Sequence, residues 1–163
     1  MRKNIRNAER RLLAELLEEG YHVAAWHGPN LGSALRGVGA ALAARSPGRG
    51  RHTIWEIALH CAYWKYVVRR RLLGLPRGSF ARKGSNWFAL PADRSAASWK
   101  RDLALLETTH RELLDTLECC SDDALRRHAR MVRGAAFHDI YHAGQIRLLR
   151  RMLRSTTTHT RKP

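Results

Sequence analysis

Two histidines four residues apart, His138 and His142, are the residues whose types and spacing most directly suggest chemistry. They lie in a run that reads as helix, where about 100° per residue places positions i and i+4 on one face. Two imidazoles placed in this way can bind a single metal ion. The alternative is a pair of hydrogen-bonded core histidines, because burying an unpaired polar group costs free energy.

A third histidine, His60, lies in a second predicted helix, on an inward stripe that it shares with Ile57 and Trp64. A lone histidine there is usually a hydrogen-bonded core residue, but this one would complete a set of three imidazoles. Three neutral imidazoles with one position left open are typical of working metal sites rather than closed structural ones. Glu56, one turn before His60, either orients that imidazole or forms a capping box with Thr53.

The composition fits one domain with a real core. The chain has 163 residues, of which 44% are hydrophobic, and we expect a domain over residues 1–154 followed by a basic, disordered tail over 155–163. No apolar run approaches the roughly 18 residues of a membrane span, and the start is not a secretory signal. The three cysteines, Cys61, Cys119 and Cys120, are odd in number and predict reduced thiols in a cytoplasmic protein.

The net charge of +16 predicts an attraction to anionic partners. The basic residues are spread along the chain, and no nucleic-acid motif or basic helix with interleaved aromatics stands out. We therefore interpret the charge mostly as a solvated surface, which would also suit a small anionic molecule or thiol as a partner. Nucleic acid is the least favoured one, and no membrane is expected.

The apolar spacing predicts an all-α chain, with punctuation from Gly and Pro between the helices. Four main helices connected in this way favour an antiparallel four-helix bundle, which builds metal sites from inward side chains on facing helices. We expect a long irregular loop over residues 77–91, packed over the bundle or lining a pocket. The main helices are predicted over residues 5–19, 54–73, from 93 or 95 to 117, and over 132–153, with a short helix over 31–38 and a short turn at Asp122 and Asp123.

Three segments together resemble the DinB-like superfamily of bacterial metal-binding four-helix-bundle proteins. They are WHGP (26–29), IWEIALH (54–60) and HDIYHAGQI (138–146), and the resemblance spans about residues 10–153. It implies an up-down-down-up bundle, often homodimeric, with zinc or nickel held by His60, His138 and His142. Some relatives are thiol-dependent S-transferases or a thiol-dependent isomerase, which use mycothiol, bacillithiol or glutathione.

Two functions follow as expectations. The first is a metal-dependent enzyme, a thiol S-transferase or a hydrolase, in which the ion lowers the pKa of a water or a low-molecular-weight thiol. The second is a non-enzymatic metal-binding or stress-response module. No Ser-His-Asp ordering, glycine-rich phosphate loop or paired-carboxylate signature points to another chemistry, and no catalytic residue is assigned.

Overall fold

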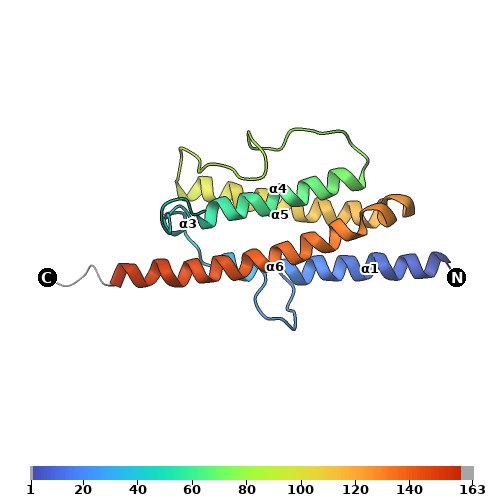
Figure 1. Ribbon diagram of the computed structural model, residues 1–163, viewed down its shortest axis with the longest axis horizontal. Helices are drawn as coiled ribbons and strands as arrows, with labels where there is room; N and C mark the ends of the chain where they lie inside the picture. The colour runs from blue at the N-terminus through green and yellow to red at the C-terminus, as the bar shows by residue number, and fades with distance from the viewer. Residues whose placement is uncertain (1, 159–163) are drawn as a thin grey trace.

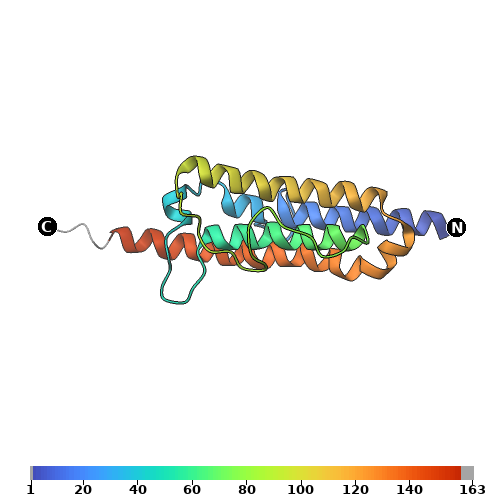
Figure 2. The same ribbon diagram turned by 90° about the horizontal axis from the view of Figure 1, so that it is seen from above.

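The computed structural model describes residues 2–158, which fold into six helices without a β-strand. Four long helices lie side by side, and two short ones lie in the connection between the first two of these (Figure 1). Figure 2 shows that α1 and α6 run in one direction, whereas α4 and α5 run in the other. The helices are α1 (Arg2–Tyr21), α2 (Leu31–Leu35), α3 (Ala40–Ala43), α4 (Ile54–Leu72), α5 (Ala96–Cys119) and α6 (Asp122–Thr158).

Helix α4 packs against both α5 and α6, and α1 closes the bundle against α6 and α5. Apolar side chains at helical spacing meet in the interior, and each fully buried Leu or Ile contributes about 1.5–3 kcal/mol relative to its exposed state. Leu17, Trp55, Leu106 and Ile146, one from each long helix, are all completely buried. This core fixes the faces that α4 and α6 present to each other.

Helix α4 begins at the predicted capping box, which the structure confirms. The Thr53 hydroxyl accepts a hydrogen bond from the Glu56 amide at 3.2 Å, and the Glu56 carboxylate accepts one from the Thr53 amide at 2.7 Å. Gly74, with a φ of 65°, follows the helix at its other end, where a residue with a Cβ would be strained. The capping box fixes the start of α4, and His60 lies two turns after it.

The last helix begins ten residues earlier than predicted, at Asp122 rather than at residue 132. The Ser121 hydroxyl accepts a hydrogen bond from the Ala124 amide at 3.1 Å, and two aspartates favour the positive end of the helix dipole. No proline interrupts the following residues, so the predicted turn at Asp122 is instead the first turn of α6. The short helix α3 was not predicted, because four residues carry no periodicity.

Helix α6 continues to Thr158, four residues into the segment 155–163 that is predicted as a tail. Residues 159–163 of that segment lie outside the part of the chain that the structure describes. In the described range, every helix is too short or too polar to cross a bilayer.

Candidate metal centre

Helices α4 and α6 bring the three predicted histidines together. The Nε2 atom of His138 lies 3.0 Å from Nε2 of His60 and 3.1 Å from Nε2 of His142. Ligand nitrogens around a tetrahedral zinc ion, with bonds of about 2.0–2.1 Å, are about 3.3 Å apart. The separations in the structure are therefore close to those of a common metal ligand set.

Hydrogen bonds at the far side of two rings fix their tautomers. His60 Nδ1 lies 2.8 Å from the backbone oxygen of Asn86, and His142 Nδ1 lies 2.7 Å from Oε1 of Gln145. The Gln145 amide group donates to the Tyr141 hydroxyl at 2.9 Å, which orients its oxygen toward His142. Since these oxygens only accept, both Nδ1 atoms carry the proton, and both Nε2 lone pairs point at His138.

Three nitrogens this close need a proton or a cation between them. Only His138 can carry its proton on Nε2, and that proton can serve one neighbour at a time. A divalent ion would accept all three lone pairs at once, with His138 in the same Nδ1–H tautomer as its neighbours. The donor set of three neutral imidazoles fits zinc, nickel, copper or iron.

Burial keeps the three imidazoles neutral. Desolvation lowers the pKa of His138 to about 3, with further lowering from the neighbouring His142 and His60. Desolvation also lowers the pKa of His142 to about 4, partly offset by the hydrogen bond to Gln145, and it lowers the pKa of His60. The neutral form is the one that a metal ion requires, so the three histidines are in a protonation state at neutral pH that could bind one.

Asn86 is a positioning residue that the sequence did not reveal. It has a left-handed backbone with φ of 64°, which asparagine tolerates better than most residues. Its carbonyl accepts from His60, and its side-chain oxygen accepts from Trp64 Nε1 at 3.0 Å. The loop between α4 and α5 therefore orients the His60 ring from outside the helix.

Trp87, the next residue in this loop, belongs to the segment expected to pack over the bundle or line a pocket, but its contact with His60 was not predicted. Its indole stacks on the His60 ring at 3.8 Å between centroids and 5° between planes. On its other face it stacks on the His52 ring at 3.6 Å and 4°. This sandwich restricts rotation of the His60 ring and shields one of its faces from water. The loop thus closes over the histidines, as expected for residues 77–91.

Glu56 has its capping role in the structure. Its carboxylate accepts from Thr53 and lies 3.9 Å from His52 Nδ1. No polar contact joins Glu56 to His60 within residues 2–158. The orienting contacts proposed for Glu56 from the sequence are instead made by Asn86 on His60 and by Gln145 on His142.

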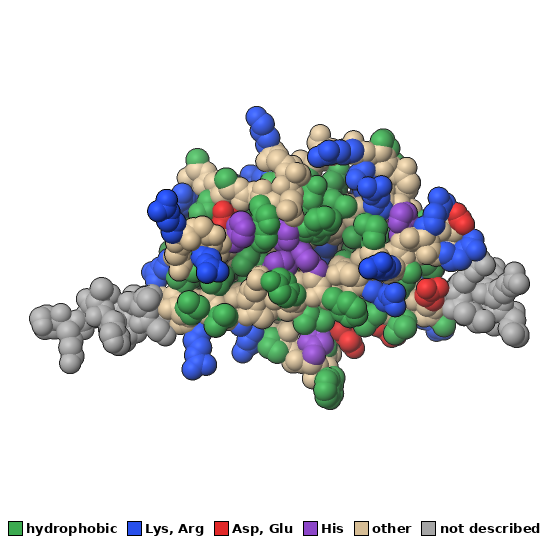
Figure 3. Space-filling model, viewed as in Figure 1, with side chains coloured by type: hydrophobic (Ala, Val, Ile, Leu, Met, Phe, Trp, Pro, Cys, Tyr) green, Lys and Arg blue, Asp and Glu red, His purple; other side chains and the backbone are tan. Residues whose placement is uncertain are grey.

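The histidines line an open cavity of about 980 Å³. Figure 3 shows histidine side chains at the centre of one face of the molecule, among hydrophobic ones. Trp64, Trp87 and Tyr141 form aromatic parts of the wall, and Arg51 is the one Lys or Arg among the described lining residues. A small molecule with an apolar body could therefore approach the three Nε2 atoms from solvent.

A second polar cluster, whose Asp139 lies within 4.8 Å of His138, ties the four long helices together. Lys65 of α4 donates to Asp139 of α6, and both side chains are 1% exposed. The Lys65 ammonium also lies 3.3 Å from His110 Nδ1 on α5 and 4.9 Å from the centroid of the Tyr21 ring on α1. The remaining oxygen of Asp139, Oδ1, has no hydrogen-bond partner in the described structure.

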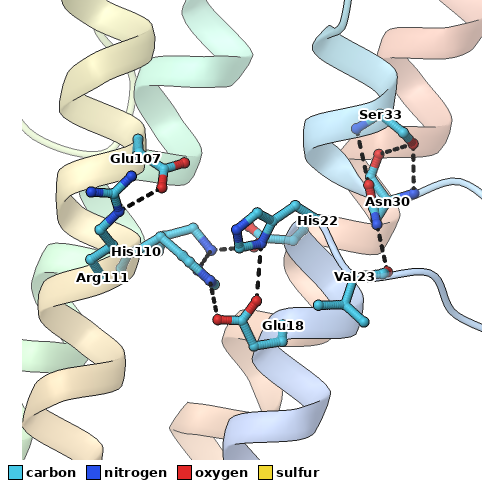
Figure 4. Close-up of polar contacts among 10 residues, drawn as sticks. Glu18, His22, Val23, Asn30, Ser33, Glu107, His110 and Arg111 are labelled. Atoms are coloured by element: carbon cyan, nitrogen blue, oxygen red, sulfur yellow. Dashed lines mark hydrogen bonds and ion pairs between the residues drawn. The ribbon is translucent and has the colours of Figure 1, made fainter.

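On the other side of His110 lie Glu18, in the last turn of α1, and His22, the first residue after that helix (Figure 4). The Glu18 carboxylate lies 3.0 Å from His22 Nδ1 and 3.7 Å from His110 Nε2. These three residues have the spacing of metal ligands. However, an ammonium only donates, so a hydrogen bond from Lys65 to His110 Nδ1 leaves the proton on Nε2. That nitrogen faces Glu18 as a donor, which favours His60, His138 and His142 as the metal ligands.

Cys61 lies close to the triad but is a poor ligand. Its sulfur is within 4.8 Å of ligand atoms of His138 and Asp139, and the side chain is fully buried. Burial raises the pKa of the thiol, so the thiolate that binds metals is disfavoured. All three cysteines are free thiols in the structure, as predicted.

These buried imidazoles predict a stability that falls with acid. In the unfolded chain histidines bind protons near pH 6.5, whereas burial lowers the folded-state pKa to about 2 for His110, 3 for His138 and 4 for His142. Between pH 6.5 and about 4 the unfolded state therefore binds more protons, and the free energy of unfolding of the metal-free protein should drop as the pH falls. Asp139 acts in the opposite direction, because burial raises its folded-state pKa to about 6 and the folded chain then takes up a proton there before the unfolded chain does. This is one proton against those of several histidines.

Thermal unfolding of the metal-free chain, followed by circular dichroism between about pH 7 and pH 4.5, checks this expectation. The melting temperature should fall steadily across this range. His138→Gln removes one of the groups and should give a shallower profile than the wild type. A flat profile for the wild type would contradict the burial of neutral imidazoles.

An all-α bundle that brings three neutral histidines to the base of an open cavity defines a helical protein with a candidate metal site. The model of the DinB superfamily matches residues 10–146. The chain belongs to the DinB superfamily, which confirms the resemblance noted from its motifs. No curated protein and no solved structure matched the chain.

Proposed function

We propose that the protein is a divalent-metal-dependent enzyme of the thiol S-transferase or hydrolase class, with His60, His138 and His142 as the metal ligands. The observation that carries the proposal is the convergence of three Nε2 atoms at the base of an open cavity of about 980 Å³. An ion with three protein ligands and one open position is the arrangement of catalytic sites, whereas structural sites are closed.

Zinc or nickel held there would act as a Lewis acid and lower the pKa of a thiol or water at its open position. Residues around the histidines orient their rings toward that position. Asn86 and Gln145 hold the Nδ1 protons of His60 and His142, so the Nε2 lone pairs face the cavity. Trp87 covers His60, and the aromatic wall with Trp64 and Tyr141 suits an apolar electrophile.

We also propose a bundle type, an assembly and a co-substrate for this chain. We assign the chain to the four-helix, up-down-down-up type, which the opposite directions of α1 with α6 and of α4 with α5 support. A homodimer is the proposed assembly, because Phe137, Tyr141 and Leu148 leave an apolar side of α6 59–62% exposed. A low-molecular-weight thiol is the proposed co-substrate.

A transfer assay tests the enzymatic part. The chain loaded with zinc or with nickel is incubated with glutathione and an aryl chloride, and formation of the thioether is followed by absorbance. We expect a rate well above the uncatalysed reaction, lost on chelation and restored by the same ion. A bound ion without any acceleration, for this and for other thiol and ester substrates, would instead favour the non-enzymatic metal-binding or stress-response module.

A further inference from the structure

A second cavity, of about 750 Å³, lies beside the metal centre under the loop between α4 and α5. Its lining differs sharply from that of the histidine cavity. Among the described residues, five that line this cavity are basic and none is acidic, whereas the histidine cavity has Arg51 as its one Lys or Arg. The basic residues are Arg70 and Arg71 from the end of α4 and Arg77, Arg82 and Lys83 from the loop.

Two of these five cations already have partners. Arg82 forms an ion pair with Asp102, which is 1% exposed, and Arg70 donates to the backbone oxygen of Leu75 at 3.1 Å. For Arg71, Arg77 and Lys83 no carboxylate partner is found among residues 2–158. Figure 3 shows Lys and Arg side chains projecting over this side of the molecule. The cavity therefore concentrates positive charge that the protein does not itself neutralise.

The two cavities share one wall. Trp64 lines both of them. Along the loop, Gly84 and Ser85 line the basic cavity, and the next two residues, Asn86 and Trp87, line the histidine cavity. Since Asn86 also bonds to Trp64, this short segment forms the partition between them. One molecule could therefore lie across the partition and occupy both cavities.

We propose that the basic cavity is a subsite for a small molecule with two or more anionic groups, whose reactive end reaches the three histidines past Trp64. Guanidinium groups pair with carboxylate, phosphate and sulfonate oxygens through paired N–H donors, which suits Arg71 and Arg77 to this task. The aromatic rings of Tyr63, Trp64 and Phe80 in the same lining suit the apolar part of such a molecule. This subsite rests on the proposed function, because it names the charge of the substrate or co-substrate.

Naphthalene-1,5-disulfonate is a suitable probe, since it carries two charges on an aromatic body and is a weak metal ligand. Its binding to the full chain is measured by isothermal titration calorimetry at low and moderate salt. We expect one saturable site per chain, weakened about tenfold or more by the double variant Arg77→Gln/Lys83→Gln, because charge-assisted hydrogen bonds are lost. Moderate salt should weaken binding without abolishing it.

The matched control is Arg94→Gln/Lys100→Gln, which removes the same two charge types from exposed positions outside both cavities. It should change the affinity by less than about twofold. Equal losses in the two double variants would show a response to net charge alone and would overturn the subsite, as would the absence of saturable binding.

His138→Ala separates the subsite from the metal centre. We expect this variant to keep its affinity for the disulfonate, because the basic cavity does not include His138. Metal bound by the wild type without disulfonate binding would overturn the subsite alone. Disulfonate binding by a chain that takes up no metal would overturn the proposed metal function alone.

Discussion

Replacing His138 with alanine should abolish the binding of a divalent ion. The Nε2 atom of His138 lies between those of His60 and His142, at 3.0 and 3.1 Å, so its loss leaves two ligands with no nitrogen between them. Changes in groups that only orient a ligand already cost about 10–100-fold in metal affinity, so the loss of a ligand should cost more than about 100-fold. Elemental analysis of untagged protein purified without chelator should give about one ion per chain for the wild type and almost none for the variant.

His128→Ala is the matched control, because it removes a histidine from the same helix outside the cavity. It should retain the metal content of the wild type, and both variants should keep the far-ultraviolet circular dichroism of a helical protein. Full metal content in His138→Ala would rule out the triad as the ligand set. A wild type that takes up no zinc or nickel on addition would identify the histidines as hydrogen-bonded core residues.

Lys65→Met should destabilise the fold by about 3–5 kcal/mol, the usual cost of leaving one partner of a buried ion pair alone. Lys65 and Asp139 are each 1% exposed, and Asp139 Oδ1 has no other partner in the described structure. A domain of this size is stable by about 5–15 kcal/mol, so the loss would be a large share. Urea unfolding of the metal-free protein, followed by circular dichroism, measures it.

Two further variants separate charge burial from packing. Lys65→Met/Asp139→Leu removes both charges and should recover much of the stability, because a buried apolar pair does not carry the desolvation cost. Lys100→Met removes an exposed lysine from α5 and should change the free energy of unfolding by less than about 0.5 kcal/mol. If the double variant is as unstable as Lys65→Met, Lys65 stabilises the fold through its packing and not through its ion pair with Asp139.

The helices and the triad could be predicted because their signals are local. The spacing of His138 and His142 places them on one face of any helix, and the Thr53–Glu56 pair marks where α4 begins. The pairing of His60 with them depended on both predicted inward stripes, and the structure does bring the three nitrogens together. The predicted start of α6 was wrong, because a pair of aspartates such as Asp122 and Asp123 is common both in turns and in the first turn of a helix.

The residues around the triad could not be predicted, because they depend on the path of an irregular loop. The carbonyl of Asn86 contacts His60 because the backbone at Asn86 is left-handed, and the periodicity of the sequence does not predict such a conformation. Trp87 could equally have been a core or surface residue of the loop. A signal did exist for Lys65, since a lysine in line with inward residues such as Cys61 and Val68 needs a buried partner. Its partner, Asp139, is 74 residues away in sequence, a pairing that only the packing of α4 on α6 decides.

The three histidines come from two helices far apart in the chain, and this has a consequence for the stability of the fold. His60 and His138 are 78 residues apart in sequence. An ion held by both would bind the folded chain and would leave on unfolding, because the two helices then separate, so it would stabilise the folded state by mass action. A free ion at about 100 times its dissociation constant would stabilise the folded chain by about 2.7 kcal/mol. The ion would thus link α4 to α6 reversibly, and chelation would lower the free energy of unfolding of the bundle as well as empty the site.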